Sequence, residues 1–286
     1  MQAIGGGMRR VGPLFTADLF PGLHEALMQL LRGLSTDDWT RPTVAGPWTV
    51  RDVVAHLVDG NVRQISFRRD GLSPVSPRRP IESHADLVRF IDELNGVWVD
   101  AFQRVSPRLL VELLDLTGPE TARVFAALDP FEPALFGVAW AGETSSTNWF
   151  DTAREYTERW HHQQQIRDAV GAEPLAGREW LHPVLDTFLR GLPHAYRQTR
   201  AGEGAVVAFH ITGEAGGRWG LRLEDGAWAL YQGAPASFDC RVAMDQDAAW
   251  RLLTKGLPPS SARERMTIEG SPELAEPFAR MLAIMG

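Results

Sequence analysis

Hydrophobic residues recur at every third or fourth position from about Leu14 to Thr199. This period places them on one face of an amphipathic helix. Connections rich in proline and glycine separate the periodic stretches. The pattern predicts six helices, at residues 15–34, 49–69, 83–105, 107–128, 147–170 and 178–198. Several long helices with no strand between them are typical of an up-and-down helical bundle.

Local signals mark the ends of two of these helices. Thr49 can cap the second helix, and Asp52, three residues later, can return a hydrogen bond to the cap. Thr147 or Asn148 can open the fifth helix, and Gly171 is suited to the left-handed conformation that closes it. The boundaries of the second and fifth helices are therefore the best defined.

The pattern changes after Gly202. Hydrophobic and polar residues alternate there as in strands, at 206–211, 219–223, 228–231 and 238–244. Asp225-Gly226 between two such runs is a strong hairpin signal. Helices are expected near 245–255 and 271–285. These elements predict a small α+β unit.

The polar, glycine-containing segment around residues 199–204 separates the two patterns. We therefore expect two domains, a helical bundle at 14–200 and an α+β domain at 205–286. A chain of 286 residues is long enough for both.

Composition narrows the possible functions. The chain is 44% hydrophobic and 23% charged, as in a globular protein with a substantial core. A net charge of −7 argues against nucleic acid as a partner. No run is long and apolar enough to span a membrane, and the first residues lack the apolar block of a secretory signal. We therefore expect a cytoplasmic protein with no membrane partner.

The chain has one cysteine, Cys240. It can form neither an internal disulfide nor a cysteine-based zinc site. Its alternation with Phe238, Val242 and Met244 places it on a strand face, so we expect a buried core thiol rather than a nucleophile. Motifs of a nucleophile elbow, a P-loop or a dinucleotide-binding loop are absent from the sequence.

The fifth predicted helix carries the strongest chemical pattern. Glu158 and His162 are four residues apart, so both side chains lie on one helix face and could share one divalent ion. His161 lies about 100° away from that face. The same spacing also fits a solvent-exposed Glu–His ion pair, and spacing alone favours that alternative.

A third ligand would have to come from another helix, and His56 is the obvious candidate. It lies away from the apolar stripe of its helix, which includes Val50, Val54 and Leu57. It is therefore either exposed or directed at a polar pocket. Asp52, one turn earlier, could orient it from the second coordination shell.

The stretch from Gly46 to Leu57, GPWTVRDVVAHL, resembles a signature of the DinB-like superfamily, and more closely that of mycothiol-dependent maleylpyruvate isomerases. Glu158-x-x-x-His162 matches the second signature of that family. The segment after residue 205, with Met266–Gly270 before a final helix, resembles the small sterol-carrier-like domain of the same family. The implied fold is a DinB-like bundle followed by a sterol-carrier-like α+β domain.

The resemblance implies that His56, Glu158 and His162 bind a divalent metal, zinc in the isomerase, with nickel or another ion possible in relatives. It also implies a low-molecular-weight thiol such as mycothiol as co-substrate. One position departs from the family, because Gln165 stands where an aspartate is common. Gln165 is therefore expected, with Asp52, in the second shell.

The implied function is a metal-dependent thiol S-transferase or a maleylpyruvate isomerase-like enzyme. It would act on a small, anionic electrophile whose carboxylate Arg63 or Arg159 could hold. The expected partners are a small-molecule thiol and the electrophile, in a monomer or homodimer. The alternative is a protein that binds a metal or an apolar ligand without catalysis. Trp219, Trp228, Phe238 and Trp250 would be available for an apolar ligand, or would simply form the core.

Overall fold

The computed structural model describes residues 7–284, which form two compact units. The helical unit comprises Thr16–Pro130 and Glu158–Pro174. The sheet unit comprises Phe131–Thr157 and Leu175–Ile284, together with residues 7–15. The units thus interleave along the sequence, whereas the predicted domains, 14–200 and 205–286, were consecutive. The sequence predicts no secretory signal at the first residues of the chain. Residues 1–6 of that segment lie outside the described range.

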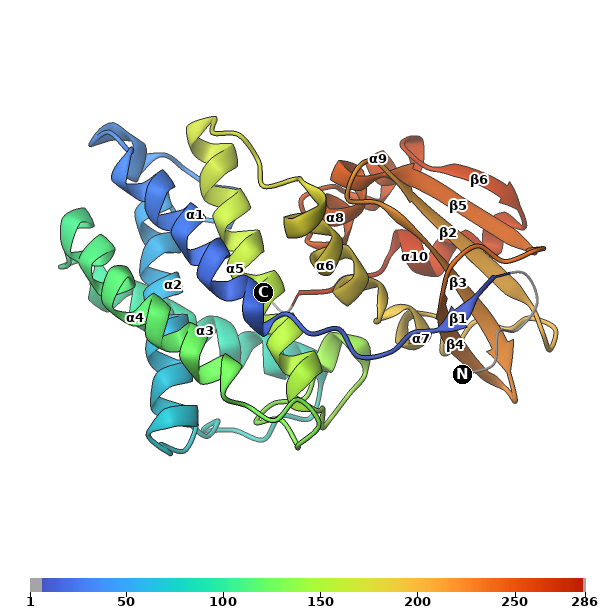
Figure 1. Ribbon diagram of the computed structural model, residues 1–286, viewed down its shortest axis with the longest axis horizontal. Coiled ribbons are helices and arrows are strands. Elements are labelled where there is room, and N and C mark those ends of the chain that lie inside the picture. Colours follow the sequence, from blue (N-terminus) through green and yellow to red (C-terminus); the bar gives the residue numbers. More distant parts are fainter. Residues whose placement is uncertain (1–6, 285–286) are drawn as a thin grey trace. The chain divides into compact units, whose positions relative to one another are not determined.

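Five of the predicted helices supply the helical unit: α1 (Phe20–Arg32), α2 (Val50–Gln64), α3 (His84–Phe102), α4 (Pro107–Ala126) and α5 (Asn148–Val170), the last from Glu158 onward (Figure 1). The predicted helices are confirmed with shorter ends. Ala17–Leu19 form a 3-10 turn before α1, and Ile65–Arg69 form a π-helical turn after α2. Gly171 has a φ of 69°, which confirms it as the left-handed residue that ends α5.

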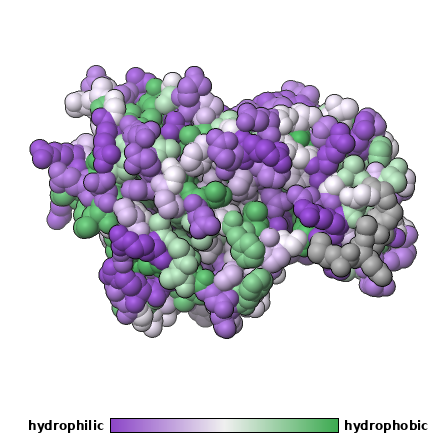
Figure 2. Space-filling view, viewed as in Figure 1, coloured by the Kyte–Doolittle hydropathy of each residue, from purple (hydrophilic) through white to green (hydrophobic). Residues whose placement is uncertain are grey.

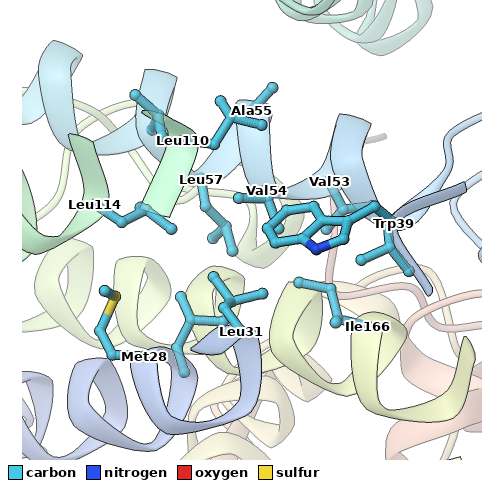
Figure 3. Close-up of a cluster of buried hydrophobic side chains, with 13 residues drawn as sticks. Met28, Leu31, Trp39, Val53, Val54, Ala55, Leu57, Leu110, Leu114 and Ile166 are labelled. Carbon is cyan, nitrogen blue, oxygen red and sulfur yellow. The ribbon is translucent and has the colours of Figure 1, made fainter. Parts of the chain in front are cut away.

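The core of the helical unit fixes α2 against its neighbours. Val53, Val54 and Leu57 of α2 are buried in one cluster with side chains from α1, α4 and α5. Figure 3 shows Ile166 of α5 near Leu31 of α1 in this cluster. Each buried side chain of this size contributes roughly 1.5–3 kcal/mol. Since His56 is adjacent to Leu57, the packing of Leu57 also sets the direction of His56.

The sheet unit contains one six-stranded sheet in the order β1-β4-β3-β2-β5-β6 (Figure 1). All neighbouring strands are antiparallel except β2 and β5, which are parallel. The strands are β1 (Arg9–Arg10), β2 (Val206–Thr212), β3 (Gly217–Glu224), β4 (Ala227–Gln232), β5 (Cys240–Asp245) and β6 (Thr267–Gly270). The prediction missed β1 and β6, the two short edge strands. Asp225 and Gly226 both have positive φ, which confirms the predicted hairpin turn between β3 and β4.

Helices α6 (Arg178–Leu189), α7 (Leu192–Ala195), α8 (Gln246–Leu253), α9 (Pro259–Glu264) and α10 (Glu276–Ala279) complete the sheet unit. The single helix predicted at 178–198 is interrupted, because Pro193, in the first turn of α7, has no N–H to continue α6. The helix predicted near 271–285 is a 3-10 turn (Pro272–Ala275) followed by α10. Residue 285 of that prediction lies outside the described residues.

The aromatic residues of the sheet unit mostly form its core. Trp219, Trp228 and Trp250 are 0%, 7% and 5% exposed, whereas Phe238 is 39% exposed. Trp219 donates a hydrogen bond from Nε1 to Asp186 Oδ1 over 2.9 Å. Three of the four aromatics considered for an apolar ligand are therefore packing residues.

Cys240 is fully buried on β5. Burial, with a smaller contribution from Asp239, raises the pKa of its thiol to about 11. This confirms the prediction of a core thiol, since a nucleophilic cysteine needs a lowered pKa.

Polar residues cover much of the surface seen in Figure 2, with smaller hydrophobic areas between them. In the part of the chain that the structure describes, no helix combines the length and hydropathy required to cross a bilayer.

Gly118 of α4 provides a first prediction about stability. A Cβ atom at this position would lie 2.2 Å from Cε1 of His24, whereas at Gly96 of α3 it would meet nothing within 4 Å. Gly118→Ala should lower the free energy of unfolding by about 1–2 kcal/mol, because overpacking costs about 1–3 kcal/mol and exceeds the helix-propensity gain. The matched control Gly96→Ala should raise it by about 0.5–1 kcal/mol. Urea unfolding checks both, and equal stability of the two variants would contradict the proposed contact.

Candidate metal site

His56 lies in the middle of α2 and is half-buried. Its ring centroid is 5.1 Å from that of Trp48 and 4.7 Å from that of His162, and it meets the His162 ring edge to face. The structure thus brings together two predicted ligands from distant segments of the chain. Trp48, which the sequence analysis did not assign to the site, covers the His56 ring.

Asp52 caps α2. Its Oδ2 accepts hydrogen bonds from the backbone N–H and the hydroxyl of Thr49, at 2.9 and 2.7 Å. Its Oδ1 accepts from the side-chain amide of Gln103. Both carboxylate oxygens are therefore used at the start of the helix. The capping role was predicted and is confirmed, and the second-shell role of Asp52 stays a prediction.

Glu158 and His162 face each other across one turn of α5. The distance from Glu158 Oε2 to His162 Nε2 is 3.7 Å, and both side chains are largely covered, at 27% and 13% exposure. A pair with this coverage differs from the solvent-exposed ion pair that spacing alone favoured. At 3.7 Å the contact is too long for a direct hydrogen bond.

Gln165 fixes the orientation of the His162 ring. Gln165 Oε1 lies 2.8 Å from His162 Nδ1, so this nitrogen carries the proton and donates. The lone pair is then on Nε2, the nitrogen that faces Glu158. The amide nitrogen of Gln165 lies 3.4 Å from Nε2 of the buried His161. Metal-binding histidines are commonly oriented by a carboxylate or a backbone carbonyl. Here the neutral side chain of Gln165 orients His162.

Helical periodicity placed His161 away from the face of α5 that carries Glu158 and His162. The sequence analysis did not predict its contact with Gln165. The signal was present in the sequence, because His161 and Gln165 are four residues apart, just as Glu158 and His162 are.

Arg63 and Arg159, the two predicted carboxylate-binding residues, lie in different surroundings. Arg63 forms an ion pair with Asp59 over 3.0 Å and donates to Asn95. Burial raises the pKa of Asp59, and Arg63 opposes that effect. The guanidinium of Arg159 lies over the ring of Phe20 and close to Asn61.

The donor atoms of His56, Glu158 and His162 are of the kinds that bind a divalent metal. Two imidazoles and one carboxylate are ligands that zinc commonly takes in catalytic sites, with a position left for a further ligand. The tautomer of His162 also fits, since its free lone pair is on the nitrogen beside the carboxylate. The three side chains do not form a closed coordination sphere: within the described residues, no group of three or more His, Cys, Asp or Glu side chains is arranged to hold a metal.

The fold and this donor set define a class of protein with two parts. One part is a helical bundle that carries two histidines and a glutamate close together, and the other is an α+β domain. Residues 20–167 match the family model described as the mycothiol maleylpyruvate isomerase N-terminal domain, so the chain belongs to that family. Residues 185–283 match the SCP-2 sterol transfer family. Both resemblances predicted from the sequence are confirmed.

One solved structure supports the same fold. The chain is similar to the crystal structure of a mutant of the mycothiol-dependent maleylpyruvate isomerase, with 13% sequence identity, a TM-score of 0.51 and coverage of 88% of this chain and 91% of that one. A second structure of that isomerase has 12% identity, a TM-score of 0.49 and coverage of 82% and 86%. At such identity the first match shows a shared fold alone. None of the curated proteins matches the sequence.

The orientation of His162 provides a second prediction. In metal-free protein at alkaline pH, the proton of the His162 ring should be on Nδ1, and Gln165→Leu should shift it toward Nε2, because the acceptor is lost. Long-range ¹H–¹⁵N correlation of the imidazole rings measures this. His182 is an internal control, because its Nδ1 lies 2.9 Å from the carbonyl of Ala215, far along the chain from the substitution. An unchanged His162 tautomer in Gln165→Leu would contradict the role of Gln165.

Proposed function

We propose that the chain is a divalent-metal-dependent enzyme that uses a low-molecular-weight thiol, such as mycothiol, to act on a small anionic electrophile. The reaction would be thiol transfer or thiol-assisted cis–trans isomerisation. The observation that carries the proposal is the convergence of the His56 and His162 rings beside Glu158. Membership of a family that includes a mycothiol-dependent isomerase supports it.

His56, Glu158 and His162 would hold the metal, with zinc the first choice and nickel the second. When bound, a divalent ion supplies Lewis acidity, which lowers the pKa of a thiol at the same site. The chain's own residues provide the orientation. Gln165 keeps the lone pair of His162 on Nε2, and the packing of Leu57 in the core directs its neighbour His56.

The thiol would come from the co-substrate rather than from the protein. Cys240 is fully buried, and burial raises the pKa of its thiol to about 11. A thiol in this state is mostly protonated at neutral pH and is not exposed to a substrate. A small thiol and its electrophile are therefore the partners proposed for this chain.

The match to the SCP-2 sterol transfer family supports a second candidate, binding of an apolar ligand by the sheet unit without catalysis. The burial of Trp219, Trp228 and Trp250 in the core weakens it, because these rings are used for packing. Lipid that co-purifies with the full chain and remains after metal removal would favour this candidate over the enzyme.

The third prediction concerns metal content. The purified chain should contain about one divalent ion, and His56→Ala, Glu158→Gln and His162→Ala should each weaken binding by at least about 100-fold, since even changes behind the ligands cost about 10–100-fold. Elemental analysis and the absorption spectrum of the cobalt-loaded protein measure this. His84→Ala is the control, because His84 is exposed at the start of α3. Wild-type protein that stays metal-free after purification without chelators and after incubation with zinc or nickel would exclude the proposed function.

The fourth prediction concerns the source of the thiol. With mycothiol and a panel of small anionic electrophiles that includes maleylpyruvate, the metal-loaded chain should consume thiol or isomerise the substrate. Cys240→Ala should retain this activity, because the reactive sulfur is not the protein's own. Activity without added thiol, or its loss in a folded Cys240→Ala variant, would contradict the proposal.

A further inference from the structure

A pocket opens in the helical unit among α1, α2, α4 and α5. It has an internal volume of about 30 Å³, roughly twice what one ordered water requires. Most of its wall is apolar, and Leu23, Leu27, Leu57 and Leu114 contribute to it. The enclosed part of the pocket thus has room for about two waters or a group of a few non-hydrogen atoms, and it is open to solvent on one side.

Gln163 lines this pocket with a carboxamide that lacks a hydrogen-bond partner. The residue is 1% exposed, and within the described part of the chain neither its Oε1 nor its Nε2 is hydrogen-bonded. A buried amide in this state costs about 1–3 kcal/mol. A ligand that accepts a hydrogen bond from Nε2 would recover part of that cost. The terminal torsion of a glutamine is soft, so the amide can turn toward such a ligand.

Arg159 supplies positive charge to the same wall. Its guanidinium carbon lies 5.5 Å from the ring centroid of Phe20 and 5.6 Å from that of Phe125. Its Nη2 also donates to Asn61 Oδ1 over 3.3 Å. These contacts hold the guanidinium in a partly apolar setting, where a bond to an anion is stronger than in water.

The remaining polar residues of the wall add no charge. Burial lowers the pKa of His24, which keeps its ring neutral at pH 7. Thr121 is 1% exposed, and its hydroxyl donates to the carbonyl of Thr117. Arg159 is therefore the ionised member of a lining that otherwise consists of apolar and neutral polar residues.

We propose that this pocket binds a short-chain monocarboxylate, with the carboxylate group in its enclosed part. The carboxylate would accept hydrogen bonds from Arg159 and from the amide of Gln163, and the alkyl chain would contact the leucines. None of the lining residues is one of the three proposed metal ligands, so this pocket can be tested separately from the metal site.

The test uses the full, metal-free chain labelled with ¹⁵N. Acetate, propionate and butyrate are titrated while the side-chain signals of Gln163 and Arg159 are followed. Propanol serves as the neutral probe of similar size, and inorganic phosphate as an anion without an alkyl chain. We expect saturable shifts with propionate, and binding of propanol and phosphate at least about tenfold weaker, since a charge-assisted bond contributes about 1.5–3 kcal/mol.

Two variants test the assignment of residues. Arg159→Gln should weaken propionate binding at least about tenfold, and Gln163→Leu should weaken it less, because it removes a neutral donor. Arg63→Gln is the control, because it removes an arginine of the same unit that does not line the pocket. His162→Ala should bind propionate like the wild type, which separates this result from any failure of the metal site.

Three results would overturn the proposal. Equal binding of propanol and propionate would show that the pocket binds the alkyl chain and does not recognise the carboxylate charge. The absence of saturable shifts in the wild type would show a pocket that holds water only. Unchanged affinity in a folded Arg159→Gln variant would show that the carboxylate binds elsewhere.

Discussion

The packing of α2 against α1, α4 and α5 is the interaction on which the rest of the helical unit depends. Val53, Val54 and Leu57 are buried in a cluster that includes Ile166 of α5. This burial fixes the rotation of α2 about its axis, since a helix can present only one face to a given neighbour. The polar residues adjacent in sequence to this face are fixed with it. His56 and His162 meet because the hydrophobic residues beside them are already packed.

The same packing explains why consecutive residues of α2 and α5 face two different sites, the proposed metal site and the pocket. His56 and Leu57, Glu158 and Arg159, and His162 and Gln163 are three pairs of neighbours on α2 and α5. Successive side chains on a helix point about 100° apart. One member of each pair is a proposed metal ligand, and the other lines the pocket. Polar residues on both faces of α5 account for its low amphipathicity, which is unusual for a helix that packs in a core.

Much of this arrangement could be predicted from the sequence, because it follows local rules. The cap at Thr49 and Asp52, the turn at Asp225-Gly226 and the helix end at Gly171 each depend on residues within one turn of each other. The ligand candidates were found by spacing and by family resemblance. The edge strands β1 and β6 were missed because they are short, and their pairing partners are distant in sequence.

The parts of the site that were not predicted depend on which atom of a side chain faces which neighbour. Periodicity placed His161 away from Glu158 and His162, but Gln165 is long enough to contact both histidines. The capping role of Asp52 was predicted, whereas the hydrogen bond that its other oxygen accepts from Gln103, on a distant segment, was not. Which partner each polar atom bonds depends on the donors and acceptors that surround it in the folded state. Residue spacing does not encode these surroundings.

The neutral side chain at position 165 has an electrostatic consequence. A carboxylate at position 165 would add a second negative charge to that of Glu158. Since the two imidazoles are neutral, these two charges would fully compensate a divalent ion. With Gln165, whose amide contacts His162 without adding charge, the same ligands would leave one positive charge uncompensated. Both oxygens of Asp52 accept hydrogen bonds at the start of α2, from Thr49 and Gln103. A residual positive charge at a partly covered site favours an anionic ligand. A thiolate and an anionic electrophile both meet that requirement, so the departure from the family pattern at Gln165 strengthens the case for anionic partners at this site.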